Sequence, residues 1–222
     1  MSRNAHPVIV DLSHAVDETT PPFPGDPPVE IQVFDSTDDP PEGARGICNS
    51  SAFRTSLHCG THMDAPFHFF GDGDAIDRVP LEFCTGAATI LRLPSAVEAG
   101  TITRDDLLPF GEEIHATRRV IFDTGWHRRW READYFTAHP VISTDAAWYL
   151  VDKDVCLIGV DFPSVDREPY KTHQVLLGSG IVIVENLTNL GAVSEDVVRF
   201  AAFPLRLSGR DGSPVRAVAI IE

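Results

Sequence analysis

Basic side chains are scarce in this 222-residue sequence, which has 18 lysines and arginines against 33 aspartates and glutamates and a formal net charge of -15. A nucleic-acid-binding protein needs basic patches to neutralise phosphates, and a protein that binds an anionic membrane surface needs them too. The composition therefore predicts neither nucleic acid nor membrane as a partner. Most of the excess acid is expected to serve solubility, while part of it can be directed at a metal ion.

Cysteines and long apolar runs are few. The four cysteines form no C-x-x-C pair, so neither a disulfide scaffold nor a thiolate zinc site is expected. The apolar residues 8–10 are too few for a signal-peptide core, and no other segment approaches membrane-spanning length. These features predict a cytoplasmic protein with reduced thiols. A G-x-S-x-G motif is also missing, which disfavours serine hydrolysis; residues 177–180 are more simply a helix stop.

The length suits a single domain over residues 1–222, with no internal repeat. Apolar and alternating segments predict strands at residues 8–12, 29–34, 52–58, 87–93, 120–123, 155–160, 181–185, 203–207 and 215–221. Helices are predicted after a capping box at Thr103 and Asp106, after Ser143 or Thr144 (145–151), after Thr172 (173–177, ending at Gly178) and after Ser194 (195–202). Strands outnumber helices without alternating strictly with them, which favours a mixed α/β domain.

Residues 35–49 contain many breakers and no periodicity. A loop of this length is commonly functional or mobile. The sequence leaves a lid, a dimer arm and a disordered surface excursion open.

The segment most typical of chemistry is residues 57–70, Leu-His-Cys-Gly-Thr-His-Met-Asp-Ala-Pro-Phe-His-Phe-Phe. His58, His62, Asp64 and His68 have the same parity, so in extended backbone all four side chains point the same way. The glycine at 60 and the proline at 66 argue against a helix, and a strand ending near His58 followed by an extended turn is expected. Imidazoles and a carboxylate on one side suit a divalent ion such as zinc or manganese.

A divalent ion needs more ligands than this segment offers, and two distant residues are candidates. His173 is at the start of a predicted helix, and Glu185 directly follows four aliphatic residues. A carboxylate in that position is either buried with a partner or at the open end of a strand. Both situations are compatible with a metal ligand.

The sequence resembles the cyclase-like metal hydrolases, a family that includes bacterial kynurenine formamidase and isatin hydrolase. The main carrier is His58-Cys-Gly-Thr-His62-Met-Asp64-Ala-Pro66-Phe-His68, which is similar to the family's H-x-G-T-H-x-D-x-P-x-H. Supporting segments follow in order along nearly the whole chain: Asp11-Leu-Ser-His14, Thr124-Gly-Trp126, Gly159-Val-Asp-Phe-Pro-Ser164, the spacing from His173 to Glu185, Pro204-Leu-Arg-Leu207 and Gly212-Ser-Pro-Val-Arg216.

The resemblance implies a compact mixed α/β fold with a barrel-like β core and flanking helices, assembled as a homodimer or higher homo-oligomer. It also implies two adjacent metal ions, with zinc favoured and manganese as the alternative. His58, His62 and Asp64 would hold the first ion, and Asp64 would bridge to a second ion bound by His173, with Glu185 touching both. His68 would be the catalytic acid/base.

The implied reaction is hydrolysis of an aryl formamide such as N-formylkynurenine, a step of tryptophan catabolism. A divalent ion lowers the pKa of bound water from about 16 towards about 7, and a nearby imidazole can supply the proton that the leaving amine needs. Phe23 occupies the position of the substrate-stacking Trp of formamidases, and Cys59 replaces the usual Thr. Phe67, Phe69 and Phe70 can wall an aromatic pocket or pack in the core. Opening of a cyclic amide or lactone such as isatin is the close alternative, and a non-catalytic metal- or ligand-binding module is the alternative of another class.

Overall fold

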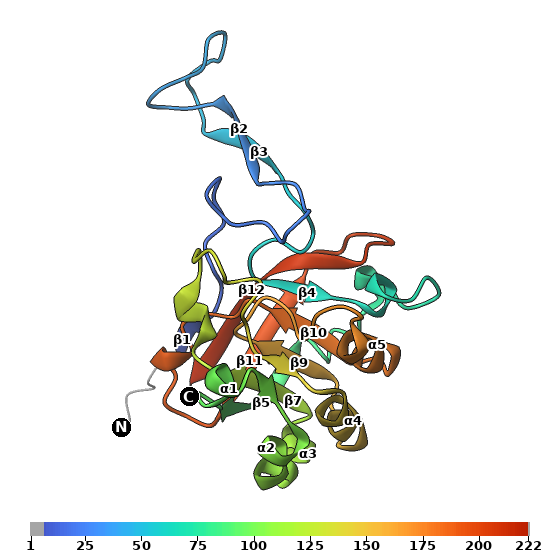
Figure 1. The fold of residues 1–222 in the computed structure, drawn as a ribbon. Helices are drawn as coiled ribbons and strands as arrows, with labels where there is room; N and C mark the ends of the chain where they lie inside the picture. The colour runs from blue at the N-terminus through green and yellow to red at the C-terminus, as the bar shows by residue number, and fades with distance from the viewer. Residues whose placement is uncertain (1–6, 222) are drawn as a thin grey trace.

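Seven strands close into a barrel in the computed structural model, which describes residues 7–221 (Figure 1). Residues 1–6 and 222, which the single-domain prediction includes, lie outside the described residues. In order around the barrel the strands are β12 (Gly212–Ile221), β11 (Val197–Pro204), β5 (Thr85–Arg92), β7 (Arg119–Asp123), β9 (Leu157–Val160), β10 (Val182–Glu185) and β4 (His62–Asp64). Strand β4 pairs with both β10 and β12, and this double pairing closes the ring. The predicted mixed α/β fold with a barrel-like core is confirmed.

The barrel combines parallel and antiparallel pairs. Strands β5, β7, β9 and β10 run parallel to one another, and the remaining pairs in the ring are antiparallel. Outside the ring lie β1 (Val8–Asp11), which pairs with β12, the hairpin of β2 (Glu30–Asp35) and β3 (Ser50–Arg54), and the short pair β6 (Thr101–Ile102) and β8 (Val141–Ile142). The helices are α1 (Ala96–Ala99), α2 (Arg104–Leu107), α3 (Gly111–Thr117), α4 (Thr144–Asp152) and α5 (Lys171–Gly178), with 3-10 turns η1 (Pro66–His68), η2 (Ile76–Arg78), η3 (Leu108–Phe110), η4 (Trp126–Arg129) and η5 (Leu190–Ala192).

The parallel strands are buried on both faces. In β7, Ile121 belongs to the cluster inside the barrel, whereas Val120 and Phe122 belong to the cluster that packs with the helices. A strand that is covered on both faces has a continuous run of apolar residues, and such a run can be recognised in the sequence. Two caps were also predicted correctly: the Thr103 backbone N–H donates to Asp106 at 2.7 Å, and Ser143 precedes α4.

The predicted helix at residues 195–202 is wrong, because this segment is strand β11. Val198, Phe200 and Ala202 alternate as buried residues, and the strand pairs with β12 on one side and β5 on the other. β-branched and aromatic residues at a period of two outweigh the cap signal of Ser194. The strand predicted at 203–207 is therefore the end of β11, which stops at Pro204, a residue with no N–H to donate.

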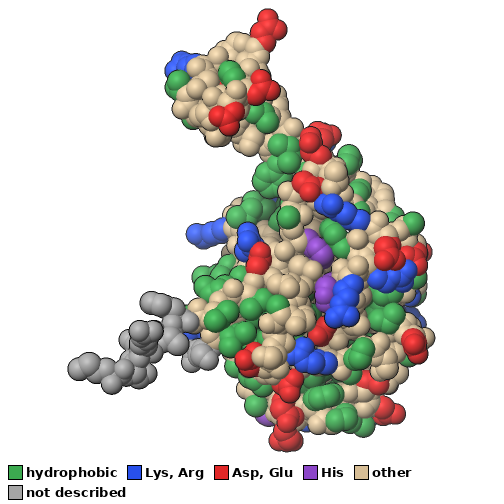
Figure 2. All heavy atoms as spheres, turned by 90° about the vertical axis from the view of Figure 1, so that its left-hand side faces the viewer, with side chains coloured by type: hydrophobic (Ala, Val, Ile, Leu, Met, Phe, Trp, Pro, Cys, Tyr) green, Lys and Arg blue, Asp and Glu red, His purple; other side chains and the backbone are tan. Residues whose placement is uncertain are grey.

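The hairpin of β2 and β3, with the loop that joins them, projects from the barrel as an arm (Figures 1 and 2). The predicted strand at 52–58 is accordingly shorter and lies at 50–54. Ile31 pairs directly with Phe53, and Val33 lies two residues on, so the three side chains share one face of the arm. Their exposed fractions are 39%, 60% and 51%. None of the helices among residues 7–221 has the length and apolarity needed to cross a bilayer.

Buried histidine makes the fold sensitive to acid. His139 is 1% exposed, its Nδ1 lies 2.9 Å from the Pro140 carbonyl, and burial lowers its pKa from 6.5 to about 4. The unfolded chain takes up this proton at a higher pH than the folded chain, so the stability contribution is complete above pH 6.5 and is lost as the pH falls towards 4. At 1.36 kcal/mol per pKa unit the loss reaches about 3 kcal/mol.

We expect His139→Gln to flatten the fall in unfolding free energy between pH 7 and pH 4, measured by urea denaturation. The exposed His115→Gln is the control, and equal pH dependence in all three proteins would contradict the assignment.

Candidate metal centre

Strand β4 places two chemistry-bearing residues on one face, because side chains two apart in a strand point the same way. The register puts Glu185 of β10 opposite His62 and Gly212 of β12 opposite Asp64. Met63, between them, points into the barrel core and is fully buried. The carboxylate of Glu185 therefore lies beside the imidazole of its cross-strand partner.

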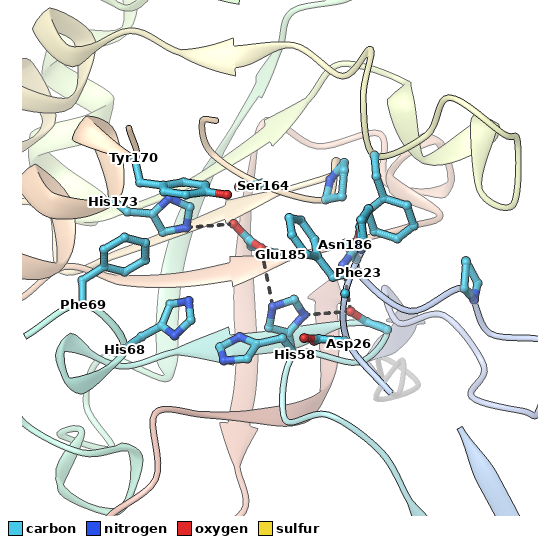
Figure 3. A pocket seen from close by; sticks show the side chains of 17 residues that line it. Phe23, Asp26, His58, His68, Phe69, Ser164, Tyr170, His173, Glu185 and Asn186 are labelled. Atoms are coloured by element: carbon cyan, nitrogen blue, oxygen red, sulfur yellow. Dashed lines mark hydrogen bonds and ion pairs between the residues drawn. The ribbon is translucent and has the colours of Figure 1, made fainter. Parts of the chain in front are cut away.

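The structure brings together all five residues predicted as metal ligands. His62 Nε2 lies 3.5 Å from Asp64 Oδ1 and 3.5 Å from Glu185 Oε2. His173 Nε2 lies 3.5 Å from Glu185 Oε1, as Figure 3 shows for this pair. The same Nε2 lies 3.9 Å from Asp64 Oδ2. His58 Nδ1 lies 2.8 Å from Asp64 Oδ1. Each carboxylate thus directs one oxygen towards His62 and the other towards His173.

These side chains form two groups with the geometry to hold a metal ion. One group is His58, His62 and Asp64, and the other is Asp64, His173 and Glu185; within each group the ligand atoms lie within 4.8 Å of one another. Asp64 belongs to both groups. Imidazole nitrogens and carboxylate oxygens are the donors that zinc and manganese accept, so the residues present fit one ion or an adjacent pair.

His58 and His68 reach the site by a different path from the one predicted. The expected strand ending near His58 stops at Arg54, His58 lies in a turn, and His68 ends the 3-10 turn η1. The parity argument therefore holds for His62 and Asp64 alone. Gly60, in the turn, has a φ of +58°, a left-handed conformation that glycine adopts without strain.

The helix that carries His173 is anchored by Asp166, a residue that sequence reasoning missed. Helix α5 begins at Lys171, after Tyr170 in the left-handed conformation, rather than after the predicted cap at Thr172. Asp166 accepts the Thr172 N–H at 2.6 Å and lies 2.6 Å from His173 Nδ1. The carboxylate caps the first turn and leaves Nε2 of His173 facing the other ligand candidates.

Buried charges in the site compensate one another. Burial would lower the pKa values of His58 and His173, but facing carboxylates, Asp64 for His58 and Asp166 and Glu185 for His173, raise both to about 10. Burial would raise the pKa of Asp64, but His58 and the other imidazoles hold it well below its usual value. Hydrogen bonds from His173 and His62 likewise hold the pKa of Glu185 down against burial and the Asp64 charge. A metal ion that binds to these side chains displaces the protons that the histidines otherwise hold.

Asn186, the residue after Glu185, fixes the turn before β4. Its side-chain N–H donates to the Gly60 carbonyl at 2.9 Å, and its side-chain oxygen accepts from the Tyr135 hydroxyl at 2.9 Å. The same Gly60 carbonyl lies 2.9 Å from His62 Nδ1, which leaves His62 Nε2 for the site. Asn186 is not among the residues predicted from the sequence, although its position directly after the candidate ligand Glu185 is a usable signal.

His68 lies at the mouth of the site, with a side chain 30% exposed. Its ring centroid is 4.1 Å from that of His58 and 6.3 Å from that of His173. Burial, reinforced by the neighbouring His58 and His173, lowers the pKa of His68. The shift favours the neutral imidazole, the form that can accept a proton.

A cavity of about 450 Å³ opens onto these groups, and its walls are aromatic. Phe23, Phe69, Phe136 and Tyr170 line it, as Figure 3 shows for the three of them that it labels. Phe23 meets Phe136 edge to face, with ring centroids 5.7 Å apart. Of the phenylalanines after Pro66, Phe69 lines the cavity, whereas Phe70 packs against Gly178 and the helical core. The volume is in the range of small-molecule sites.

A further group, Asp123, His127 and Asp161, lies apart from the cavity. The Asp161 carboxylate accepts from the Thr124 N–H and hydroxyl and from the Gly125 N–H, and it lies 3.0 Å from His127 Nδ1. These contacts engage both of its oxygens. The group ties the ends of β7 and β9 together, which explains two of the sequence segments that support the resemblance.

Comparison with known proteins agrees with this geometry. The family described as putative cyclase matches residues 10–167. Kynurenine formamidases of Bacillus cereus and Geobacillus thermodenitrificans are 32% and 35% identical to the chain over 212 residues, which cover 94% of the chain and 95% of each relative.

Solved structures share the fold. Isatin hydrolase A from Labrenzia aggregata superposes with a TM-score of 0.84 at 23% identity, covering 97% of this chain and 94% of that one. A predicted metal-dependent hydrolase from Bacillus stearothermophilus gives 0.78 at 25% identity, covering 97% and 99%. With a family match over most of its length and relatives above 30% identity along nearly all of it, the chain belongs to the putative cyclase family.

Proposed function

We propose that the chain is a metal-dependent hydrolase of an aryl formamide, with N-formylkynurenine of tryptophan catabolism as the leading substrate. The carrying observation is the pair of buried carboxylates, Asp64 and Glu185, that both face His62 and His173 beside an aromatic cavity. The kynurenine formamidase relatives support the same class of reaction on C–N bonds other than peptide bonds.

We propose that two divalent ions bind to the five predicted ligands. His58, His62 and Asp64 would hold the first and His173 the second, with Asp64 and Glu185 available to both. The split of the carboxylate oxygens between His62 and His173 supports this arrangement. Zinc suits a set of imidazoles and carboxylates best, and manganese is the alternative.

The chemistry divides between the ions and the protein. Bound divalent ions would supply a Lewis acid that activates water and polarises the substrate carbonyl. His68 would accept the proton that the attacking water loses and return it to the departing aryl amine. Phe23 and Phe136, which meet edge to face in the cavity wall, would hold the aryl ring.

A substrate screen tests the proposal. Metal-free protein, reloaded with zinc or manganese, is assayed on N-formylkynurenine, isatin and simple lactones, with the metal-free protein as the control. We expect metal-dependent release of formate from N-formylkynurenine. If the reloaded protein hydrolyses none of these substrates, the proposed function is contradicted.

Opening of a cyclic amide such as isatin is the second candidate. The solved isatin hydrolases share the fold, and phenylalanine at position 23 gives a smaller stacking surface than tryptophan and no indole N–H. Ring opening without formate release is the outcome that favours it. A non-catalytic binding module has less support, because it has no use for an imidazole such as His68 beside the ligand set.

We propose that the chain assembles as a homodimer through the arm. A two-stranded hairpin is marginally stable alone, and the face formed by Ile31, Val33 and Phe53 is apolar and exposed. A second copy that covers this face removes it from water. We expect Phe53→Asp to convert a dimer to a monomer in light scattering, while Leu81→Asp, an equally exposed leucine outside the arm, leaves the dimer intact. A wild-type monomer, or a Phe53→Asp dimer, would contradict the arm interface.

We also propose a cytoplasmic location. All four cysteines are free thiols, three of them buried, as expected for a protein of a reducing compartment.

A further inference from the structure

Asp211 lies in the turn directly before β12 and is held against the metal-site segment by its backbone. The Asp211 carbonyl accepts the Ala65 N–H at 2.9 Å, and the next residue, Gly212, is paired with Asp64 in the ladder. The Asp211 side chain is 38% exposed at the mouth of the site. Neither the comparisons nor the sequence motif gives this carboxylate a role.

The Asp211 carboxylate faces two histidines at once. Its Oδ2 lies 2.7 Å from His58 Nε2 and 3.7 Å from His68 Nδ1. The opposite nitrogen of His58 faces Asp64 at 2.8 Å. The His58 ring also rests on the backbone of Gly212, where an added Cβ would lie 2.9 Å from the ring carbon Cε1. The turn therefore supports His58 by a hydrogen bond and by close packing.

The other two histidines of the ligand set have outer partners of their own. Nδ1 of His62 faces the Gly60 carbonyl, and Nδ1 of His173 faces Asp166. Outer partners of this kind fix the tautomer and the ring orientation of a metal-binding histidine. Asp166 is buried and serves α5 alone, whereas Asp211 is partly exposed and is shared with a histidine outside the ligand set.

We propose that Asp211 is a positioning residue that orients both His58, in the ligand set, and His68, the acid/base. This inference rests on the proposed function for the roles of the two histidines. The contact between Asp211 and the two rings does not depend on that function. Loss of an outer partner typically lowers metal affinity by about ten- to a hundredfold. Loss of Asp211 should in addition disturb proton transfer by His68, which loss of Asp166 should not.

The test compares Asp211→Asn with Asp166→Asn, and uses Asp72→Asn, an exposed aspartate in the loop after η1, as a control for the change of charge. Zinc affinity is measured against a competing chelator. Rates at saturating zinc are measured on a formanilide and on an activated aryl ester. We expect both site variants to lose about ten- to a hundredfold in affinity. Only Asp211→Asn should also lower the amide-to-ester rate ratio. Wild-type affinity or a wild-type ratio in Asp211→Asn would overturn the shared role.

A measurement without metal separates this inference from the proposed function. In the metal-free protein, long-range proton–nitrogen NMR of the histidine rings should show the signals of His58 and His68 shifted by Asp211→Asn, with those of His173 unchanged. The Asp166→Asn variant should show the reverse pattern. Unmoved His58 and His68 signals would overturn the inference even if the wild type is an active hydrolase. Shifted signals in a protein that hydrolyses nothing would support positioning by Asp211 and leave the proposed function refuted.

Discussion

Replacing His68 with alanine is expected to lower kcat on a formanilide-type amide by roughly a hundred- to ten-thousand-fold, the usual contribution of a general acid/base. Metal content should stay at the wild-type level, because His68 is not among the five proposed ligands. KM should change less than kcat, since in the proposed mechanism His68 moves the proton while the aromatic cavity walls bind the ring. Steady-state kinetics measures kcat and KM, and elemental analysis of the same sample measures the metal content.

The leaving group gives the His68 prediction its control. An activated ester leaves without needing a proton, so the variant should be much less impaired on the ester than on the amide. His115→Ala, an exposed histidine on α3, should match the wild type on both substrates. Loss of metal in proportion to activity would make His68 a ligand, and full activity on amides would leave it a packing residue.

The second large effect is expected from the shared carboxylates. Asp64→Asn and Glu185→Gln should each abolish activity and deplete both ions, since each residue faces His62 and His173 together. Wild-type protein should hold one to two ions per chain, and the variants should fall well below that in elemental analysis. Removing a direct charged ligand should cost more than the roughly hundredfold affinity that an outer partner supplies.

Glu112→Gln, an exposed acid in the first turn of α3, is the matched control for the carboxylate variants and should retain metal and rate. Thermal unfolding of each metal-free protein shows whether a variant has simply failed to fold. Full metal occupancy in folded Asp64→Asn and Glu185→Gln would show that the ligand assignment is wrong.

The part of the site that the sequence predicts is the part with local periodicity. His62 and Asp64 share a strand face, and a period of two can be recognised within one segment. Glu185 can be predicted as a ligand for another reason, because it is a carboxylate at the end of an aliphatic run. The fold class followed from the same runs, because strands covered on both faces are continuously apolar.

The remainder depends on pairings that no local pattern encodes. Asp211 approaches His58 only because β12 pairs with β4. Asp166 reaches His173 across a turn whose conformation cannot be predicted from its residue types. The sequence favours a helix at residues 195–202 because a cap signal is local, whereas β12 and β5, the partner strands that make this segment β11, are distant in sequence. The arm was recognised as a breaker-rich loop, but its direction away from the barrel was not predictable.

Closure of the barrel by β4 and β12 sets when the site can exist during synthesis. Strand β4 begins at His62, and the strand that completes its ladder, with Gly212 opposite Asp64, is synthesised much later. Such a distant pairing carries a large loop-closure entropy and forms late in folding. A nascent chain therefore presents its histidines and carboxylates as separate weak donors. The assembled centre can exist only once β12 has been made and has paired with β4, so an ion that needs the whole proposed ligand set would bind after that pairing.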